Sequence, residues 1–240
     1  LDKTPFYGES GGQAGDCGKL TNGRGGIFTV ETTAKNAQGV YLHIGKAEKG
    51  TFELSDTVTA QVCEQTRQAT MRNHTSAHLM QAALRKVLGT HVEQAGQLVN
   101  AERMRFDFTH FSALTPEEIK EVEDLVNEEI LKGEDVVIKE MPIDEAKKLG
   151  AMALFGEKYG DVVRVVKAGD FSTELCGGTH VSNTSKIGLF RIVSESSVAA
   201  GVRRIEAVTG RAVLSLLDQC EQTIKNTASA LKAGKADLAD

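Results

Sequence analysis

Two five-residue motifs constrain this chain more than any other feature. In a helix, residues four positions apart share a face, so the first motif places two imidazoles one turn apart. Two glycines separate the Cys and the His of the second motif, which favours a tight loop. The motifs are His74-Thr75-Ser76-Ala77-His78 and Cys176-Gly177-Gly178-Thr179-His180. Imidazole and thiolate are ligands that suit zinc, so we predict a zinc site formed by His74, His78, Cys176 and His180.

A simpler interpretation is that His74 and His78 lie on a helix surface and bind nothing, because short patterns recur by chance. The second motif argues against this interpretation, because it adds a cysteine and a further histidine, which are both ligands that suit zinc. A metalloprotease helix is excluded, because it carries Glu directly after the first His as a general base. Here that position is Thr75.

Composition limits the class of protein. The 240 residues carry a net charge of −5, which argues against a strong non-specific nucleic-acid binder. Residues 115–150 hold a net charge of −7, so the remainder is slightly basic and can still accept an RNA end. No apolar run is long enough to span a membrane. The four cysteines form no CxxC pair, which favours a reduced, cytoplasmic protein. Because the first residue is Leu1, we expect a piece of a longer chain.

The first 68 residues read as β-structure. Extended runs at 26–33, 39–46 and 58–63 are divided by turn residues and follow a glycine-rich stretch from Gly8 to Gly18. Short strands at this spacing predict a small N-terminal β-barrel domain over residues 1–68. Gly11, Gly12 and Gln13 lie in the glycine-rich stretch, where they form either a simple turn or one wall of a functional cleft.

The second unit, residues 69–208, mixes helices with hairpins and predicts an α+β domain with a largely antiparallel sheet. A helix from about Ala69 to Leu88 is expected, with Thr70 or Asn73 as its N-cap, Gly89 as its end, and a buried stripe of Ala77, Met80, Leu84 and Val87. Further helices are expected at 115–131, opened by a capping box at Thr115, and at 144–149. Strands are expected within 91–99 and at 104–108, 136–141, 162–167, 187–194 and 202–208.

Residues 209–240 are expected to form a C-terminal helix, capped by Thr209, that leads to a further domain. Its apolar residues recur at spacings of four, three, four and seven, which gives a narrow seam suited to packing on another helix. The seam consists of Val213, Leu217, Cys220, Ile224 and Leu231. The alternative is that the helix packs back on its own domain.

Several blocks of the sequence, in the right order, resemble one known family. TPFYGESGGQAGD, NHTSAHLMQAALRKVLGTHVEQAGQLVN, ELCGGTHV and GVRRIEAVTG are similar to the editing domain of bacterial alanyl-tRNA synthetases and the segment before it. The resemblance runs from about residue 1 to about residue 210. It implies a translation-factor-like barrel, zinc, and hydrolysis of tRNA(Ala) that is mischarged with Ser or Gly. Ligase activity is not expected in this piece.

The resemblance also implies roles for individual residues. Gln94 would lie in the hairpin near the metal and act in catalysis, unless it is only an exposed hairpin residue. For Cys176 the motif itself predicts a metal ligand in the catalytic site and not a covalent nucleophile, because no separate His is left to act as its base. Arg203 and Arg204, which lie in one of these blocks, either face the phosphates of the acceptor end of tRNA(Ala) or are ordinary surface arginines. The remaining candidates for substrate binding are Thr75, Gly11, Gly12, Gln13 and Thr179.

Two other functions stay open from the sequence. One is a free-standing alanyl-tRNA trans-editing protein, which shares both zinc motifs; the initial Leu1 and the trailing helix argue against it. The other is a non-catalytic RNA-binding module with a structural zinc. Four protein ligands are typical of structural zinc, whereas catalytic zinc usually has three and an open position.

Overall fold

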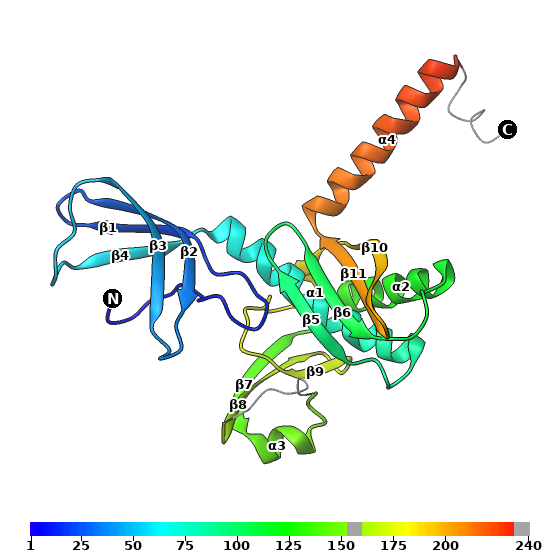
Figure 1. Ribbon diagram of the computed structural model, residues 1–240, viewed down its shortest axis with the longest axis horizontal. Coiled ribbons are helices and arrows are strands. Elements are labelled where there is room, and N and C mark those ends of the chain that lie inside the picture. The colour runs from blue at the N-terminus through cyan, green and yellow to red at the C-terminus, as the bar shows by residue number, and fades with distance from the viewer. Residues whose placement is uncertain (153–159, 233–240) are drawn as a thin grey trace.

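The computed structural model describes residues 1–152 and 160–232, which form three antiparallel sheets and four α-helices in the described part. Figure 1 shows the first sheet on one side, α1 leading from it into the centre of the molecule, and α4 pointing away from the body. An α+β architecture with antiparallel sheets and a C-terminal helix is therefore confirmed. Within the described residues, no helix is both long and apolar enough to cross a membrane.

The N-terminal unit is an open sheet, so the predicted barrel is wrong. Its strands are β1 (Gly18–Asn22), β2 (Ile27–Lys35), β3 (Tyr41–Lys49) and β4 (Val58–Val62), in the order β3-β2-β1-β4. In the described chain, β3 pairs only with β2 and β4 only with β1, so the two edges never meet. Alternation of polar and apolar residues is the same in an open sheet and in a barrel, so the sequence could not separate them. Only Phe6, Leu20 and Val30 form the buried core of this unit.

Helix α1 (Glu64–Leu88) begins earlier than predicted and crosses the expected domain boundary at residue 68. Cys63 occupies the N-cap, and neither Thr70 nor Asn73 caps the helix. The Thr70 hydroxyl donates to the Thr66 carbonyl inside the helix, and the Asn73 amide donates to the carbonyl of Asn100. These tertiary and intrahelical partners use up the side chains that the sequence assigned to capping. The predicted end at Gly89 and the buried Ala77, Met80 and Leu84 are confirmed.

The second sheet packs against α1 and α2 (Pro116–Lys132). It has the order β10-β11-β6-β5 and consists of β5 (Gln94–Val99), β6 (Met104–Thr109), β10 (Phe190–Ala199) and β11 (Val202–Thr209). Met104, Phe106 and Phe108 project from β6 into the main core, as their alternation predicts. The capping box at Thr115 is confirmed, because its hydroxyl accepts from the Glu118 amide and the Glu118 carboxylate accepts from the Thr115 amide.

The third sheet positions the second motif, residues 176–180. It has the order β7-β8-β9 and comprises β7 (Val136–Pro142), β8 (Val162–Ala168) and β9 (Ser172–Leu175), with α3 (Ile143–Lys148) against it. Strands β7 and β8 were predicted, whereas β9 was not, because its four residues are too few for a pattern. A short 3-10 turn (Thr184–Ile187) follows the motif and packs on α2.

Helix α4 (Arg211–Leu231) is confirmed as an element but not its predicted cap. Gly210 is the N-cap, and the Thr209 hydroxyl instead donates to Asn73 Oδ1 on α1 at 2.6 Å. Of the predicted seam, only Val213 is buried, while Leu217, Ile224 and Leu231 are 57%, 46% and 66% exposed. The alternative in which the whole helix packs back on its own domain does not hold for this face. Residues 233–240 of the expected C-terminal segment lie outside the described residues.

Candidate metal centre

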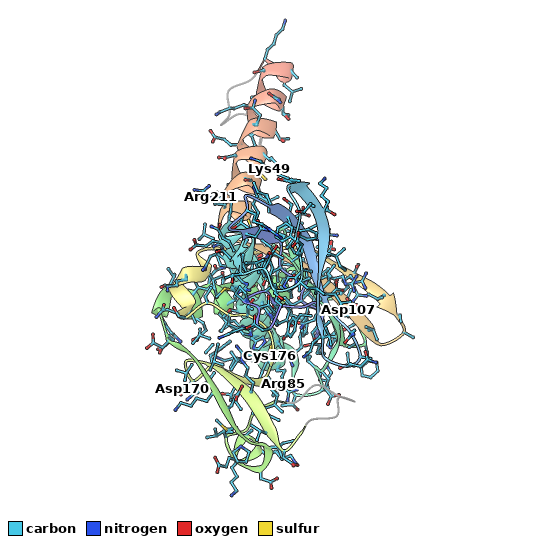
Figure 2. All side chains as sticks on the ribbon, turned by 90° about the vertical axis from the view of Figure 1, so that its left-hand side faces the viewer. Lys49, Arg85, Asp107, Asp170, Cys176 and Arg211 are labelled. Atoms are coloured by element: carbon cyan, nitrogen blue, oxygen red, sulfur yellow. The ribbon has the colours of Figure 1, made fainter. Side chains whose placement is uncertain are left out.

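The two sequence motifs meet where α1 passes the loop after β9. One ligand atom from each of His74, His78, Cys176 and His180 lies within 4.8 Å of every other. Cys176 Sγ is 3.5 Å from His74 Nε2 and 3.3 Å from His180 Nε2. Figure 2 shows Cys176 at the end of the β7–β9 sheet, close to the centre of the molecule. Three imidazoles and one thiol at this separation could hold a metal ion, and the donor set is consistent with zinc.

The loop after β9 can reach α1 because residue 178 has no side chain. A methyl group on Gly178 would lie on the imidazole of His74 and against Gln13 Oε1. At Gly177, in contrast, a methyl group would meet no atom within 4 Å. The turn is also held from within, since the Gly178 amide lies 3.3 Å from Cys176 Sγ. Gly178 is therefore needed for the close approach of the loop to His74, whereas the surroundings of Gly177 leave room for a side chain.

Each imidazole of the cluster is oriented through its second nitrogen. Nδ1 of His74 lies 2.7 Å from Gln13 Oε1, Nδ1 of His180 lies 3.2 Å from Thr75 Oγ1, and Nδ1 of His78 lies 3.5 Å from Glu174 Oε2. The Thr75 hydroxyl donates to the Met71 carbonyl, so it accepts from His180. Such outer partners fix the ring orientation and tautomer of metal-binding histidines. Thr75 is thus a supporting residue of the cluster, buried to 1% exposure.

Gln13 ties the glycine-rich loop to the cluster. Its side chain is fully buried, and its Oε1 accepts from the Thr179 amide at 2.8 Å as well as from His74. Its Nε2 donates to Thr179 Oγ1 at 2.9 Å. Because Oε1 is an acceptor in both contacts, His74 carries its proton on Nδ1 and leaves Nε2 free for a metal. Gln13 and Thr179, two of the predicted substrate-binding residues, therefore contact each other and the cluster.

Strand β5 holds the glycine-rich loop in place. The Val99 amide donates to the Gly12 carbonyl at 2.8 Å, and the Gln97 side chain donates to the Gly11 carbonyl at 2.6 Å. Both Gly11 and Gly12 have positive φ, which favours glycine. A side chain on Gly12 would also clash with the backbone of Gln97. The loop from the N-terminal unit is thereby fixed against the second unit beside the cluster.

Burial keeps the three histidines neutral. It lowers the pKa of His74 to about 4 and the pKa values of His78 and His180 well below their usual range, and the Arg164 charge lowers all three further. Neutral imidazole is the form that binds metal ions. Burial also raises the pKa of Glu174 to about 8, so its contact with His78 is not an ion pair at neutral pH in the absence of a metal.

A cleft of about 300 Å³ lies beside the cluster. Its walls come from the glycine-rich loop, β5, β8 and the loop after β9, and they bring His74 and Cys176 to the cleft surface. Burial raises the pKa of Tyr7 in this wall to about 12, so its phenol stays neutral. The lining residues are Tyr7, Ser10, Gly11, His74, Gln97, Gly160, Val162, Val163, Arg164, Leu175, Cys176, Gly177 and Gly178. The cluster is therefore reached from a space large enough for a small organic group.

Other predicted site residues lie elsewhere. Gln94 begins β5 opposite Phe108 and is not among the described residues that line this cleft, whereas Gln97, three residues further along β5, is. Arg203 and Arg204 lie on β11, where each guanidinium forms a two-point contact with a carboxylate, Glu195 and Asp107 respectively. No role of these residues is tested by the geometry, so their assignments stay predictions.

Three site residues were missed from the sequence. Glu174 contacts His78, while Arg164 and Gln97 line the cleft. Arg164 interrupts the apolar run Val162-Val163-Arg164-Val165-Val166, and a lone charge in such a run was a usable signal. Glu174 precedes the second motif by two residues, but its burial could only be known from the fold.

Comparisons with known proteins agree with this arrangement. Residues 163–206, which hold the second motif, match the family described as threonyl and alanyl tRNA synthetase second additional domain. Residues 1–66, which hold Gln13, match class II (A) tRNA synthetases. Over 237 residues, 99% of this chain, it is 58% identical to an alanine–tRNA ligase of Acetivibrio thermocellus.

Nearly the whole chain matches one segment of the alanine–tRNA ligases. It is also 57% identical over 232 residues to a member from Nitrosomonas europaea and 50% identical over 238 residues to one from Bacillus velezensis. It spans 27% of the length of these relatives. These matches therefore cover only part of a whole alanine–tRNA ligase and do not by themselves assign its activities to this chain.

Proposed function

We propose that this chain is the editing part of an alanine–tRNA ligase and hydrolyses the ester of tRNA(Ala) mischarged with serine or glycine, in the cytoplasm. The observation that carries this proposal is the convergence of His74, His78, Cys176 and His180 beside a cleft of about 300 Å³. The family relationship supports tRNA as the substrate. Cys17, Cys63 and Cys220 carry thiols outside any disulfide, in keeping with a reducing compartment.

The chemistry follows from the donor set. A bound zinc ion supplies a Lewis acid that lowers the pKa of water and polarises an ester carbonyl. The residues that would hold it are His74, His78, Cys176 and His180, kept neutral by burial in the case of the histidines. Gln13 and Thr75 hold the ring planes of two of these ligands. The adjoining cleft gives the aminoacyl end of a tRNA access to the cluster.

A physical need for such a site follows from the limits of binding specificity. A pocket built for alanine cannot strongly reject glycine, which lacks one methyl group, or serine, which adds one hydroxyl. Discrimination through one methylene is worth only about 1–3 kcal/mol. A second site that hydrolyses wrong products removes the remaining errors.

Cys176 acts in this proposal as a metal ligand and not as a nucleophile. Its sulfur lies 3.3–3.5 Å from the Nε2 atoms of two imidazoles of the cluster, a position that suits a ligand of the same metal ion. A thiolate bound to a metal is held and its charge is shared. Hydrolysis should then proceed without an acyl-enzyme, and single-turnover quenching with labelled Ser-tRNA(Ala) should trap no serine on the protein.

The competing function is a non-catalytic RNA-binding module in which the metal is structural. The closed set of four ligands favours it, since structural zinc usually has four protein ligands. The open cleft that reaches His74 and Cys176 favours the catalytic role.

Deacylation kinetics separate the two functions. The zinc-loaded chain should hydrolyse Ser-tRNA(Ala) much faster than Ala-tRNA(Ala), and a Cys176→Ala/His180→Ala variant should lose both the metal and the activity. A chain that binds one zinc but leaves Ser-tRNA(Ala) intact would support the structural role. Equal metal content in the wild type and the double variant would refute the ligand assignment.

A further inference from the structure

Arg164 is the residue of the cleft that the metal chemistry leaves unexplained. It lies on β8 and points over the loop that follows β9. Its Nη1 donates to the carbonyls of Cys176 and Gly178, each at 2.7 Å. The guanidinium is therefore fixed against the metal loop and is not a freely moving surface charge.

The remaining donors of Arg164 face no acceptor that the structure describes. A guanidinium has five N–H groups in a planar fork, and the two contacts of Nη1 leave those on Nε and Nη2. Among residues 1–152 and 160–232, no carboxylate forms an ion pair with Arg164. The other arginines named above differ, since Arg203 and Arg204 each hold a carboxylate at two points.

The described lining of the cleft carries a positive charge, whereas the net charge of the chain is negative. Acidic residues outnumber basic ones in the sequence, 33 to 28, yet none lines the cleft among the described residues. Apart from the cluster residues His74 and Cys176, Arg164 is the one side chain of the described lining that carries a formal charge at neutral pH. The ligand that this surface favours is an anion that can accept a planar pair of hydrogen bonds, such as a phosphate or phosphodiester.

We propose that Arg164 binds the phosphate on the 5′ side of the terminal nucleotide of the RNA, and so positions the aminoacyl ester against the metal cluster. This inference rests on the proposed function and adds the anion-binding part of its substrate site. The ester and this phosphate belong to the same nucleotide, so a cleft that borders both Arg164 and Cys176 can hold them together. Arg164 is a substrate-binding residue in this role, and it leaves the chemistry of the ester to the cluster.

The test uses two ligands that cannot be hydrolysed. Both are 3′-deoxy-3′-(serylamino)adenosine, one with and one without a 5′-phosphate, and their affinities for the zinc-loaded chain are measured by calorimetry. In the wild type, the phosphate should improve affinity about ten- to a hundredfold, and this advantage should fall with rising salt. In Arg164→Gln the two ligands should bind equally, at the affinity of the unphosphorylated ligand for the wild type.

Controls separate charge, folding and function. Arg24→Gln removes the same charge from the N-terminal sheet, where Arg24 pairs with Glu53 and Asp56, and should keep the full phosphate advantage. Metal content reports on folding. Should Arg164→Gln not fold, Arg164→Lys decides the matter, because a lysine keeps the charge without the planar fork. A phosphate advantage reduced at least about threefold in Arg164→Lys supports the proposal, and an unchanged one contradicts it.

Two other outcomes would overturn the inference. A phosphate advantage that survives in Arg164→Gln would overturn the inference even if the wild type deacylates Ser-tRNA(Ala). Inorganic phosphate that binds as tightly as the phosphorylated ligand would show a free-anion site and would also overturn it. A separate comparison tests the editing function. If the chain does not recognise the seryl group, adenosine with and without that group should bind equally.

Discussion

At the scale of single residues, Gln13 links two parts of the chain that are distant in sequence. It belongs to the glycine-rich loop of the N-terminal unit, yet its carboxamide contacts His74 on α1 and Thr179 in the loop after β9. A buried amide that orients a metal ligand adds to affinity without touching the metal, typically ten- to a hundredfold.

We therefore expect Gln13→Leu to weaken zinc binding by about ten- to a hundredfold, measured by competition with a chromophoric chelator. Gln13→Glu should retain much of the affinity, since it still accepts from His74. Gln38→Leu, at an exposed position in the β2–β3 turn, provides the control and should change nothing. Wild-type zinc affinity in Gln13→Leu would remove Gln13 from the site.

The two glycines of the second motif give a matched pair of variants. Gly178→Ala should abolish metal binding or destabilise the fold, because the new methyl group would occupy the place of the His74 ring. Gly177→Ala should bind zinc as the wild type does, because nothing lies within 4 Å of its added methyl group. Elemental analysis and thermal melts of both proteins test this, and equal metal loss in the two would contradict the described loop.

Residue types and spacing predicted the ligand cluster but not its surroundings. Four side chains of types that can bind a metal, at helical and loop spacing, are visible in the sequence alone. The contacts of Gln13, Glu174 and Arg164 depend on which strands and loops meet, and no local pattern encodes that.

At the scale of elements, α2 shows how local chemistry defines a helix start. The reciprocal bonds between Thr115 and Glu118 satisfy two backbone donors, and Pro116 fits the first helical position. We expect Thr115→Ala to lower the free energy of unfolding by about 1 kcal/mol and Thr115→Ser to restore most of it. Denaturant titration checks both values, and no loss in Thr115→Ala would show that the packing of α2 alone fixes its start.

Helix α4 presents the reverse case, a helix with little packing. Most of its residues are exposed, and an isolated helix of this length is marginal in water without tertiary contacts. In hydrogen exchange of this chain, amides of α4 beyond Leu217 should exchange much faster than those of α1. Equal protection would contradict this expectation and would mean that the seam of α4 is covered in solution.

Long periodic elements were predicted well and short or competing ones were not. Helices α1, α2 and α4 and the alternating strand β6 repeat their pattern over many residues. Strand β9 is too short for a pattern. The predicted cap at Thr70 was lost to a hydrogen bond within the helix, and those at Asn73 and Thr209 were lost to tertiary hydrogen bonds. The barrel was wrong because strand patterns do not show whether edge strands meet.

At the scale of the whole molecule, the candidate site lies where the N-terminal unit meets the second unit. The glycine-rich loop, α1, β8 and the loop after β9 all contribute to it. An ion bound there would connect these elements, and binding to the folded state alone stabilises it. We propose that this junction is a metal-dependent hydrolase for mischarged tRNA.

The most direct test is to strip the chain of metal, restore zinc in steps and measure Ser-tRNA(Ala) deacylation at each step. We predict that the stripped chain is inactive and that the rate rises in proportion to bound zinc until about one ion per chain, where it levels off. A stripped chain that deacylates Ser-tRNA(Ala) at the full rate would show that the hydrolysis does not depend on a bound metal ion.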